Sequence, residues 1–230
     1  MPGHVRSLIG VCATAAVIAG ALLAWSGAVR PLVGFAIFAL GGLVALLIAL
    51  ASLVQAARGR GVTLGGTLAI VIAVVFVAAA SRGRGHPRIN DFTTDLDDPP
   101  TFTFARSFPD NAGRDLAYPR EFAPIQRACC ADLHPVHLPL PPEQAYLRVL
   151  AVSSLMPGWR ITSADAMGRT IEAVDTSRLF HFQDDIVLRV RADGDGSRVD
   201  VRSKSRDGKG DLGVNATRIR AITQRLETSS

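Results

Sequence analysis

Three long uncharged runs at the start of the chain constrain its fold more than any other feature. Residues 7–29, 31–57 and 61–81 hold 23, 27 and 21 consecutive residues without an acidic or basic side chain. A helix of about 20 apolar residues crosses the roughly 30 Å hydrocarbon core of a bilayer. The sequence therefore predicts a transmembrane region, residues 1–87, with three membrane-spanning helices.

The charges of the chain divide at the end of this region. Residues 1–87 contain six arginines and no acid, whereas residues 88–230 contain 19 basic and 20 acidic residues. The basic pI of 9.7 thus comes from the flanks of the apolar runs. Nucleic-acid binding would need basic residues clustered on a folded domain, so the composition disfavours it. The apolar runs contain no acidic or basic side chain, which disfavours proton-coupled transport.

The arginines also bear on orientation. The first run has no small-residue cleavage site, which favours a retained anchor over a removed signal peptide. Arg6 precedes the first run and only Arg30 follows it, and the first hairpin usually dominates topology. This predicts a cytoplasmic N-terminus in a bacterial inner membrane. Three spans then place residues 88–230 in the periplasm or outside the cytoplasm.

Residues 88–230 have the patterns of an α+β domain. Period-2 alternation predicts strands at 136–140, 159–166, 169–180, 185–190 and 198–204, and 3.6-residue periodicity predicts a helix at 141–156. A last helix carries Ile219, Ile222 and Leu226 on one face. The order strand, helix, four strands, helix predicts an antiparallel sheet with two helices on one face, a helix-grip-like architecture.

Two loops in this domain have alternative interpretations. Asp193-Gly194-Asp195-Gly196 resembles part of a calcium loop, but it lacks the further carboxylates and the bidentate Glu, so a tight hairpin turn is favoured. Residues 205–215 are glycine-rich, with Asp211 or Asn215 as the N-cap of the last helix. Such a loop could bind an anion through free N–H groups. Its glycines do not have Walker or Rossmann spacing, and a network that locks the loop is favoured.

The segment before the first long strand has little periodicity. Residues 88–135 are predicted to pack over the sheet in an extended conformation, with core positions for four phenylalanines: Phe92, Phe102, Phe104 and Phe108. Cys129 and Cys130 precede a His-x-x-His pair at His134 and His137, which could be imagined as a zinc site. The adjacent cysteines lack the usual gap between zinc ligands, so buried cysteines and no metal are predicted.

Several runs of residues 88–228 resemble one family. These are I-N-D-F-T-T-D with P-P (89–100), Y-P with Phe122 and Gln126, R-L-F-H-F-Q-D-D (178–185) and S-R-D-G-K-G-D-L-G-V-N-A-T-R-I (205–219). Together they resemble the bacterial and plastid family called domain of unknown function 1499. The sequence departs from the family pattern at Cys129-Cys130-Ala131-Asp132-Leu133. At this place the pattern of the family is similar to Tyr-Pro-Asp followed by an aliphatic residue. The resemblance implies a domain of this family in the envelope or a lumen, and no established activity.

Three classes of function are compatible with these observations, and one of them is an assembly partner of a larger membrane complex that uses the three spans as its interface. The other two concern the domain at residues 88–230. One is a membrane-anchored envelope protein whose soluble domain binds a lipid, a peptide or a protein partner. The other is a hydrolase or transferase at the membrane surface, for which Ser205, His181 and Asp184 or Asp185 are candidates that no sequence context ties together. The envelope binding protein is favoured, with the bilayer and envelope components as partners and with no catalytic residue, cofactor or metal assigned. The binding or loop-network candidates are Arg178, Arg206, Lys209, Asp211, Asn215, Arg218, Asn90 and Asp91.

Overall fold

The computed structural model describes residues 3–81, 83 and 85–228, and it contains two compact units. The first unit holds the N-terminal helices and residues 178–181, and the second holds residues 85–177 and 182–230. The α+β fold class inferred from the sequence is confirmed, as set out below.

The first unit contains three helices that are long and apolar enough to cross a membrane. They are α1 (Gly3–Trp25), α2 (Pro31–Ala57) and α3 (Leu64–Ser81). Helix α1 begins four residues before the uncharged run 7–29 and ends before it does, because the absence of charge does not mark where a helix stops. Glycines allow the helices to approach: a Cβ at Gly10 would lie 2.2 Å from the carbonyl oxygen of Gly65, and one at Gly20 would lie 2.6 Å from that of Gly34.

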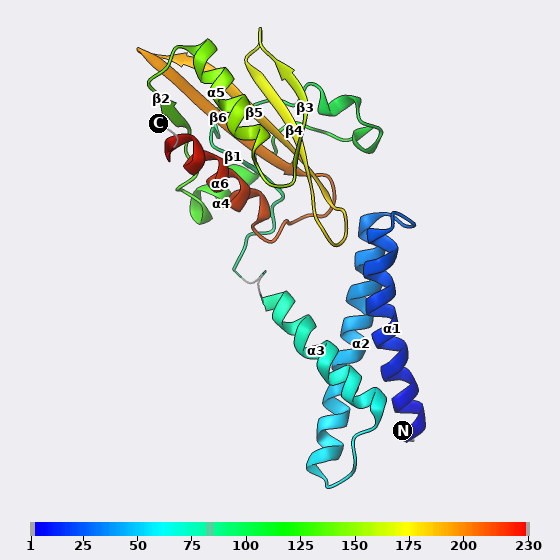
Figure 1. The fold of residues 1–230 in the computed structure, drawn as a ribbon. Helices are drawn as coiled ribbons and strands as arrows, with labels where there is room; N and C mark the ends of the chain where they lie inside the picture. The colour runs from blue at the N-terminus through cyan, green and yellow to red at the C-terminus, as the bar shows by residue number, and fades with distance from the viewer. Residues whose placement is uncertain (1–2, 82, 84, 229–230) are drawn as a thin grey trace. The chain divides into compact units, whose positions relative to one another are not determined.

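The second unit is built on one antiparallel sheet (Figure 1). Its strands run in the order β1-β6-β5-β4-β3, and β2 also pairs with β6. The strands are β1 (Asp91–Thr93), β2 (Val136–Leu138), β3 (Trp159–Asp165), β4 (Thr170–Thr176), β5 (Gln183–Asp193) and β6 (Gly196–Ser205). The helices are α4 (Phe122–Cys129), α5 (Pro142–Ser154) and α6 (Val214–Thr228), with short 3-10 helices η1 (Ala105–Ser107) and η2 (Pro109–Asn111).

Helices α5 and α6 cover one face of the sheet and form the main core with it (Figure 1). The apolar stripe of α6 packs onto β6 and the short strands β1 and β2, and α5 packs onto β5 and β3, with the core side chains almost completely buried. The alternation that predicted these strands therefore places Ile186 and Leu188 of β5 in the same core as Ile219 and Ile222 of α6. Pro142 lies in the first turn of α5 and marks where the helix begins. Gly158, with a φ of +83°, follows the end of the helix.

The opposite face of the sheet is covered by residues 94–120, here called the covering segment. Phe102, Ala105 and Leu116 from this segment pack with Val187 of β5 in a second, smaller apolar cluster. The expected packing over the sheet is thus present, but the segment contains η1 and η2 and is not extended throughout. Phe104 is 42 % exposed and does not occupy a core position. Phe92 is buried on the helix-covered side instead, since neighbouring strand residues point to opposite faces.

The turn between β5 and β6 is a two-residue hairpin turn, as the Asp-Gly steps predicted. Asp193 pairs with Gly196, and Gly194 has a φ of +56°. A positive φ of this kind is required in the tight turns that match strand twist, and glycine adopts it without strain.

Candidate functional site

Two aspartates lie side by side on the helix-covered face, at the end of the sheet where β6 leads into α6. Strand pairing sets Asp175 of β4 opposite Asp184 of β5, and Asp184 opposite Ser205 of β6. Like charges directly opposite each other destabilise a sheet. This register therefore requires a cation between the two carboxylates.

Arg218 of α6 supplies that cation. Its Nη2 donates to Asp175 Oδ2 at 2.8 Å and to Asp184 Oδ2 at 2.7 Å, and its Nε donates to Asp175 Oδ2 at 3.0 Å. Its Nη1 also donates to Ser203 Oγ at 3.0 Å and to Asn215 Oδ1 at 2.6 Å. The guanidinium is buried and joins three strands to the last helix.

Asn215 connects the same helix to β6 and to the start of the domain. Its Oδ1 accepts a hydrogen bond from Ser203 Oγ at 2.6 Å, and its Nδ2 donates to Ser205 Oγ at 2.9 Å and to the carbonyl oxygen of Asn90 at 3.2 Å. The side chain of Asn90 in turn donates to the carbonyl oxygen of Gly208 at 2.7 Å. Asn90, Asn215 and the two serines thus lock the loop between β6 and α6.

Asp211 caps α6. Its carboxylate accepts the backbone N–H of Gly213 at 2.9 Å and that of Asn215 at 2.7 Å. Burial raises the pKa of Asp211 above its usual range, and the charge of Asp184 raises it further, against the lowering effect of these N–H groups. Because a carboxylate of the chain already takes these N–H groups, they are not available to an external anion. Of the two expected caps, Asp211 has this role.

We call this cluster the helix-side network: Asn90, Asp175, Asp184, Ser203, Ser205, Asp211, Asn215 and Arg218. It sets three carboxylates against one guanidinium, and the pKa of Asp211 is raised by its burial. It contains two hydroxyls that could in principle be nucleophiles. Both are bonded to the amide of Asn215, which is neither a base nor an acid.

A second network lies beneath the covering segment. Asp91 is completely buried, and Arg202 Nε and Nη2 donate to its two carboxylate oxygens at 2.9 and 2.8 Å. Lys204 Nζ donates to Asp91 Oδ2 at 2.9 Å. Arg202 also donates to the carbonyl oxygens of Pro100 and Leu116 at 3.0 and 2.8 Å. The network therefore binds the covering segment to the sheet by its backbone.

Aromatic rings complete the surroundings of Arg202. Its guanidinium carbon lies 4.8 Å from the centre of the Phe102 ring and 5.6 Å from that of Tyr118. Both distances are within the range of a cation–π contact. Burial raises the pKa of Tyr118, and the negative charge of Asp91 raises it further.

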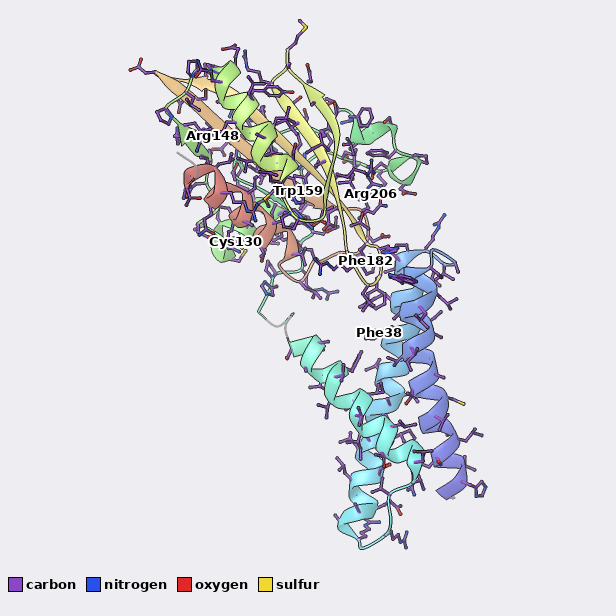
Figure 2. The ribbon with its side chains drawn as sticks, viewed as in Figure 1. Phe38, Cys130, Arg148, Trp159, Phe182 and Arg206 are labelled. Carbon is purple, nitrogen blue, oxygen red and sulfur yellow. The ribbon has the colours of Figure 1, made fainter. Side chains whose placement is uncertain are left out.

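Glu172 and Arg206 hold the middle of the covering segment. Glu172 is buried, and its carboxylate accepts three consecutive backbone N–H groups, those of residues 103, 104 and 105, at 2.7–2.8 Å. Arg206, whose position is labelled in Figure 2, pairs with Asp185 at 2.7 Å, stacks on Phe108 at 4.8 Å and also bonds Gln183. Asp184 and Asp185 thus serve opposite faces of the sheet, as alternation along a strand predicts.

Six more charged residues close the far part of this face: Asp95, Asp98, Arg189, Arg191, Arg198 and Asp200. Asp200 is buried, and Asp95 accepts from Arg198 at 2.7 Å and from Arg191 at 3.0 Å. Burial by itself would raise the pKa of Asp95, but the backbone N–H of Asp98 and the guanidinium of Arg198 hold it below its ordinary value. We call these six residues the cover-side network, together with the other charged residues between the sheet and the covering segment: Asp91, Glu172, Asp185, Arg202, Lys204 and Arg206.

The structure separates the candidate residues of the sequence into three places. Asn90, Asp211, Asn215 and Arg218 come together in the helix-side network, whereas Asp91 and Arg206 lie in the cover-side network. Arg178 and Lys209 are exposed on loops.

Sequence reasoning missed Glu172, Asp175 and Arg202 as site residues. The available signal was the charged face of β6, with Arg198, Asp200, Arg202 and Lys204 in alternation. That pattern also fits a solvated strand face, and only the covering segment makes these residues buried.

The region of the two cysteines differs in part from expectation. Cys130 is buried, but Cys129 is exposed, because it ends the short helix α4 at the surface. Although the residue is exposed, partial desolvation of its sulfur and the neighbouring thiol of Cys130 raise the pKa of Cys129 above its ordinary value. His137 pairs with Asp193 at 2.7 Å on an open part of the surface. Among the described residues, no group of three or more His, Cys, Asp or Glu could hold a metal ion.

These features define the class of the protein: an antiparallel α+β domain, with buried charges on both sides of its sheet, joined to three helices able to span a membrane. The model of the family described as "Protein of unknown function (DUF1499)" matches residues 91–226. The chain belongs to this family.

Two further comparisons add little. No curated protein matches the sequence at a significant level. Among solved structures, the chain is similar to one titled "Crystal structure of Ara h 8.0201", with 12 % sequence identity and a TM-score of 0.28 over 41 % of this chain and 95 % of that chain. A similarity this weak supports no inference about function.

Proposed function

We propose that this protein is a membrane-anchored envelope protein whose soluble domain works by binding a lipid, a peptide or a protein partner. One observation carries the proposal: the acids, hydroxyls and amides of the helix-side network bond to one another. Arg218 donates to Asp175 and Asp184, and Asn215 is hydrogen-bonded to both serine hydroxyls. Asp211 accepts N–H groups at the start of α6. Side chains that bond to one another in this way stabilise the fold, and a domain that works by binding needs a stable fold.

The binding surface must be sought outside the core. The apolar side chains between α6 and the sheet are completely buried, for example Ile186, Ile219 and Leu226. A ligand that used them would have to open the core, at the cost of the apolar burial that stabilises the domain. The proposal therefore assigns binding to the surface loops and helix faces of the domain.

Location forms part of the proposal. The apolar helices would anchor the protein in a bacterial inner membrane with a cytoplasmic N-terminus, and the domain would lie in the periplasm. Alkaline phosphatase fused to the C-terminus would then be active and a green fluorescent protein fusion dark. The reverse result would exclude a periplasmic domain.

The network itself offers a matched pair for testing binding against catalysis. Ser203 and Ser205 both bond to Asn215, and Ser203 also accepts a hydrogen bond from Arg218, so Ser203→Ala removes two hydrogen bonds of the network and Ser205→Ala removes one. In a strain that lacks the gene, a binding domain predicts that each variant complements in proportion to its thermal stability and membrane level, with the larger loss for Ser203→Ala. Complete loss with Ser205→Ala alone, at normal stability and level, would instead establish a nucleophile and refute the proposal.

The two aspartates give a second pair. Asp175 and Asp184 share Arg218 as their partner, so Asp175→Asn and Asp184→Asn remove comparable ion pairs. Equal, graded losses agree with a structural role for both. A selective loss at Asp184 in a fully folded protein would identify a catalytic acid or base and support the membrane-surface hydrolase or transferase.

A further inference from the structure

Leu212, in the loop between β6 and α6, has two features that the fold does not explain. It is 61 % exposed, and its φ of +55° lies in the left-handed region that a leucine rarely adopts. An exposed apolar side chain gains nothing from the core, and a left-handed non-glycine residue is strained. Residues held in strained conformations cluster at functional positions.

The loop presents Leu212 rigidly. The carboxylate of Asp211 holds the N–H groups of Gly213 and Asn215, and thereby fixes the backbone on either side of Leu212. Val214, the first residue of α6, is 48 % exposed. Two exposed apolar side chains thus lie two residues apart where the backbone is held at the start of α6, and they are called the apolar surface below.

Basic residues border this surface. Lys209 is exposed in the same loop, and His86 and Arg88 are exposed in the segment that enters the domain. This segment packs against the loop: a Cβ at Gly210 would lie 3.3 Å from the Cα of Arg88, and one at Gly213 would lie 2.3 Å from Nδ1 of His86. Of the two acids in this loop, Asp211 is engaged with the helix N-terminus, and Asp207 is half-buried two residues before Lys209.

The covalent chain limits how far this surface can lie from a membrane. Helix α3 has 18 residues, so at 1.5 Å per residue it is about as long as the hydrocarbon core is thick. Three residues separate Ser81 from Gly85, and an extended chain covers at most about 3.6 Å per residue. Gly85 therefore stays within about 15 Å of the end of the helix in any arrangement of the two units.

We propose that Leu212 and Val214, bordered by Lys209 and Arg88, form a docking surface for the anionic headgroup layer of the bilayer that holds the three helices. The leucine and the valine enter the boundary between headgroups and acyl chains, as the apolar face of an interfacial segment does. The basic residues face anionic lipid. This inference goes beyond the proposed function, because it assigns a surface that fixes the domain on the membrane and leaves its partner site elsewhere.

Site-directed fluorescence on the full chain in nanodiscs tests the proposal. The label is placed at Leu212→Cys in a background with Cys12→Ala and Cys129→Ser, which leaves only the buried Cys130. Met167→Cys is the matched control: it is 93 % exposed and lies on the turn between β3 and β4. That turn is at the other end of β4, about 20 Å along the strand from the end near this loop.

The expected result is severalfold stronger quenching of the label at 212 than at 167 by lipids with a nitroxide headgroup, and weaker quenching by aqueous iodide. Replacing phosphatidylglycerol by phosphatidylcholine, or introducing Lys209→Gln, should lower the docked fraction. One basic residue at an anionic surface contributes about 1 kcal/mol, a change of about fivefold in the docking equilibrium.

Two results would overturn the docking surface. Equal iodide quenching at the two positions means that Leu212 faces water, and protection from both quenchers means that protein covers it. If Leu212→Cys does not fold, a label at Val214→Cys reports on the same surface. A thermal melt of each labelled variant establishes that it is folded. Failure of docking would leave the serine and aspartate comparisons unchanged, so the two proposals can be judged separately.

Discussion

Arg202→Met should weaken the soluble domain more than any other single arginine substitution on the cover side. The guanidinium is 1 % exposed and donates to Asp91 through two bonds and to the carbonyl oxygens of Pro100 and Leu116. Methionine keeps the length of the stem but removes all of these donors. Asp91 would then have Lys204 as its cation and would lose its bidentate partner.

The expected loss follows from these contacts. Breaking a buried ion pair by removing one partner costs about 3–5 kcal/mol, and each buried carbonyl left without a donor adds about 1–3 kcal/mol. The remaining lysine offsets part of this, so we expect about 4 kcal/mol in the free energy of unfolding. Domains of this kind are stable by about 5–15 kcal/mol, so the variant should melt about 10–15 °C lower.

The assay is thermal unfolding of the full chain in detergent, followed by near-ultraviolet circular dichroism, with trypsin cleavage in parallel. Arg202 binds the covering segment by its backbone, so cleavage after Arg106 and Arg114 should precede global unfolding. Arg178→Met is the control, because Arg178 is exposed and its substitution should change stability by less than about 0.5 kcal/mol. Equal melting of the two variants, with no earlier cleavage, would show that Arg202 does not anchor the segment.

Three other predictions concern single residues. Asn215→Ala should lower the free energy of unfolding by about 2–3 kcal/mol in chemical denaturation, since it leaves buried partners on β6 unsatisfied; a change below about 0.5 kcal/mol would contradict the network. Asp95→Asn should lower the free energy of unfolding at neutral pH, and the difference from the wild type should shrink as the pH falls below the ordinary aspartate pKa of 3.8. The pKa of Asp95 is depressed in the folded protein, so the wild-type carboxylate loses its contribution to stability only when it is protonated in this low pH range. A deficit that does not change between neutral pH and pH values below the ordinary value would refute this. Leu212→Gly should raise the free energy of unfolding in detergent by about 1 kcal/mol through relief of the left-handed strain, and an unchanged or lower melting temperature would show that the leucine is not strained.

Much of the architecture follows from local patterns in the sequence. The uncharged runs determine three apolar helices, because a helix in a bilayer must be long and apolar over its whole length. Alternation along 185–190 and 198–204 determines two strands, and the Asp-Gly steps between them determine the tight turn. The helical stripe at Ile219, Ile222 and Leu226 determines which face of α6 enters the core. Each of these signals repeats within a few residues, so the chain itself shows them.

The candidate site depends on contacts between residues that are far apart in the sequence. Asp175 and Asp184 become neighbours through strand register, and Arg218 reaches them only because α6 crosses their end of the sheet. The charged face of β6 would fit a strand open to water just as well. It is buried because residues 94–120 fold over it, and that segment has no period of its own by which its position could be predicted. Its place is decided by where Arg202 and Glu172 find backbone groups to bond, which only the assembled tertiary structure determines.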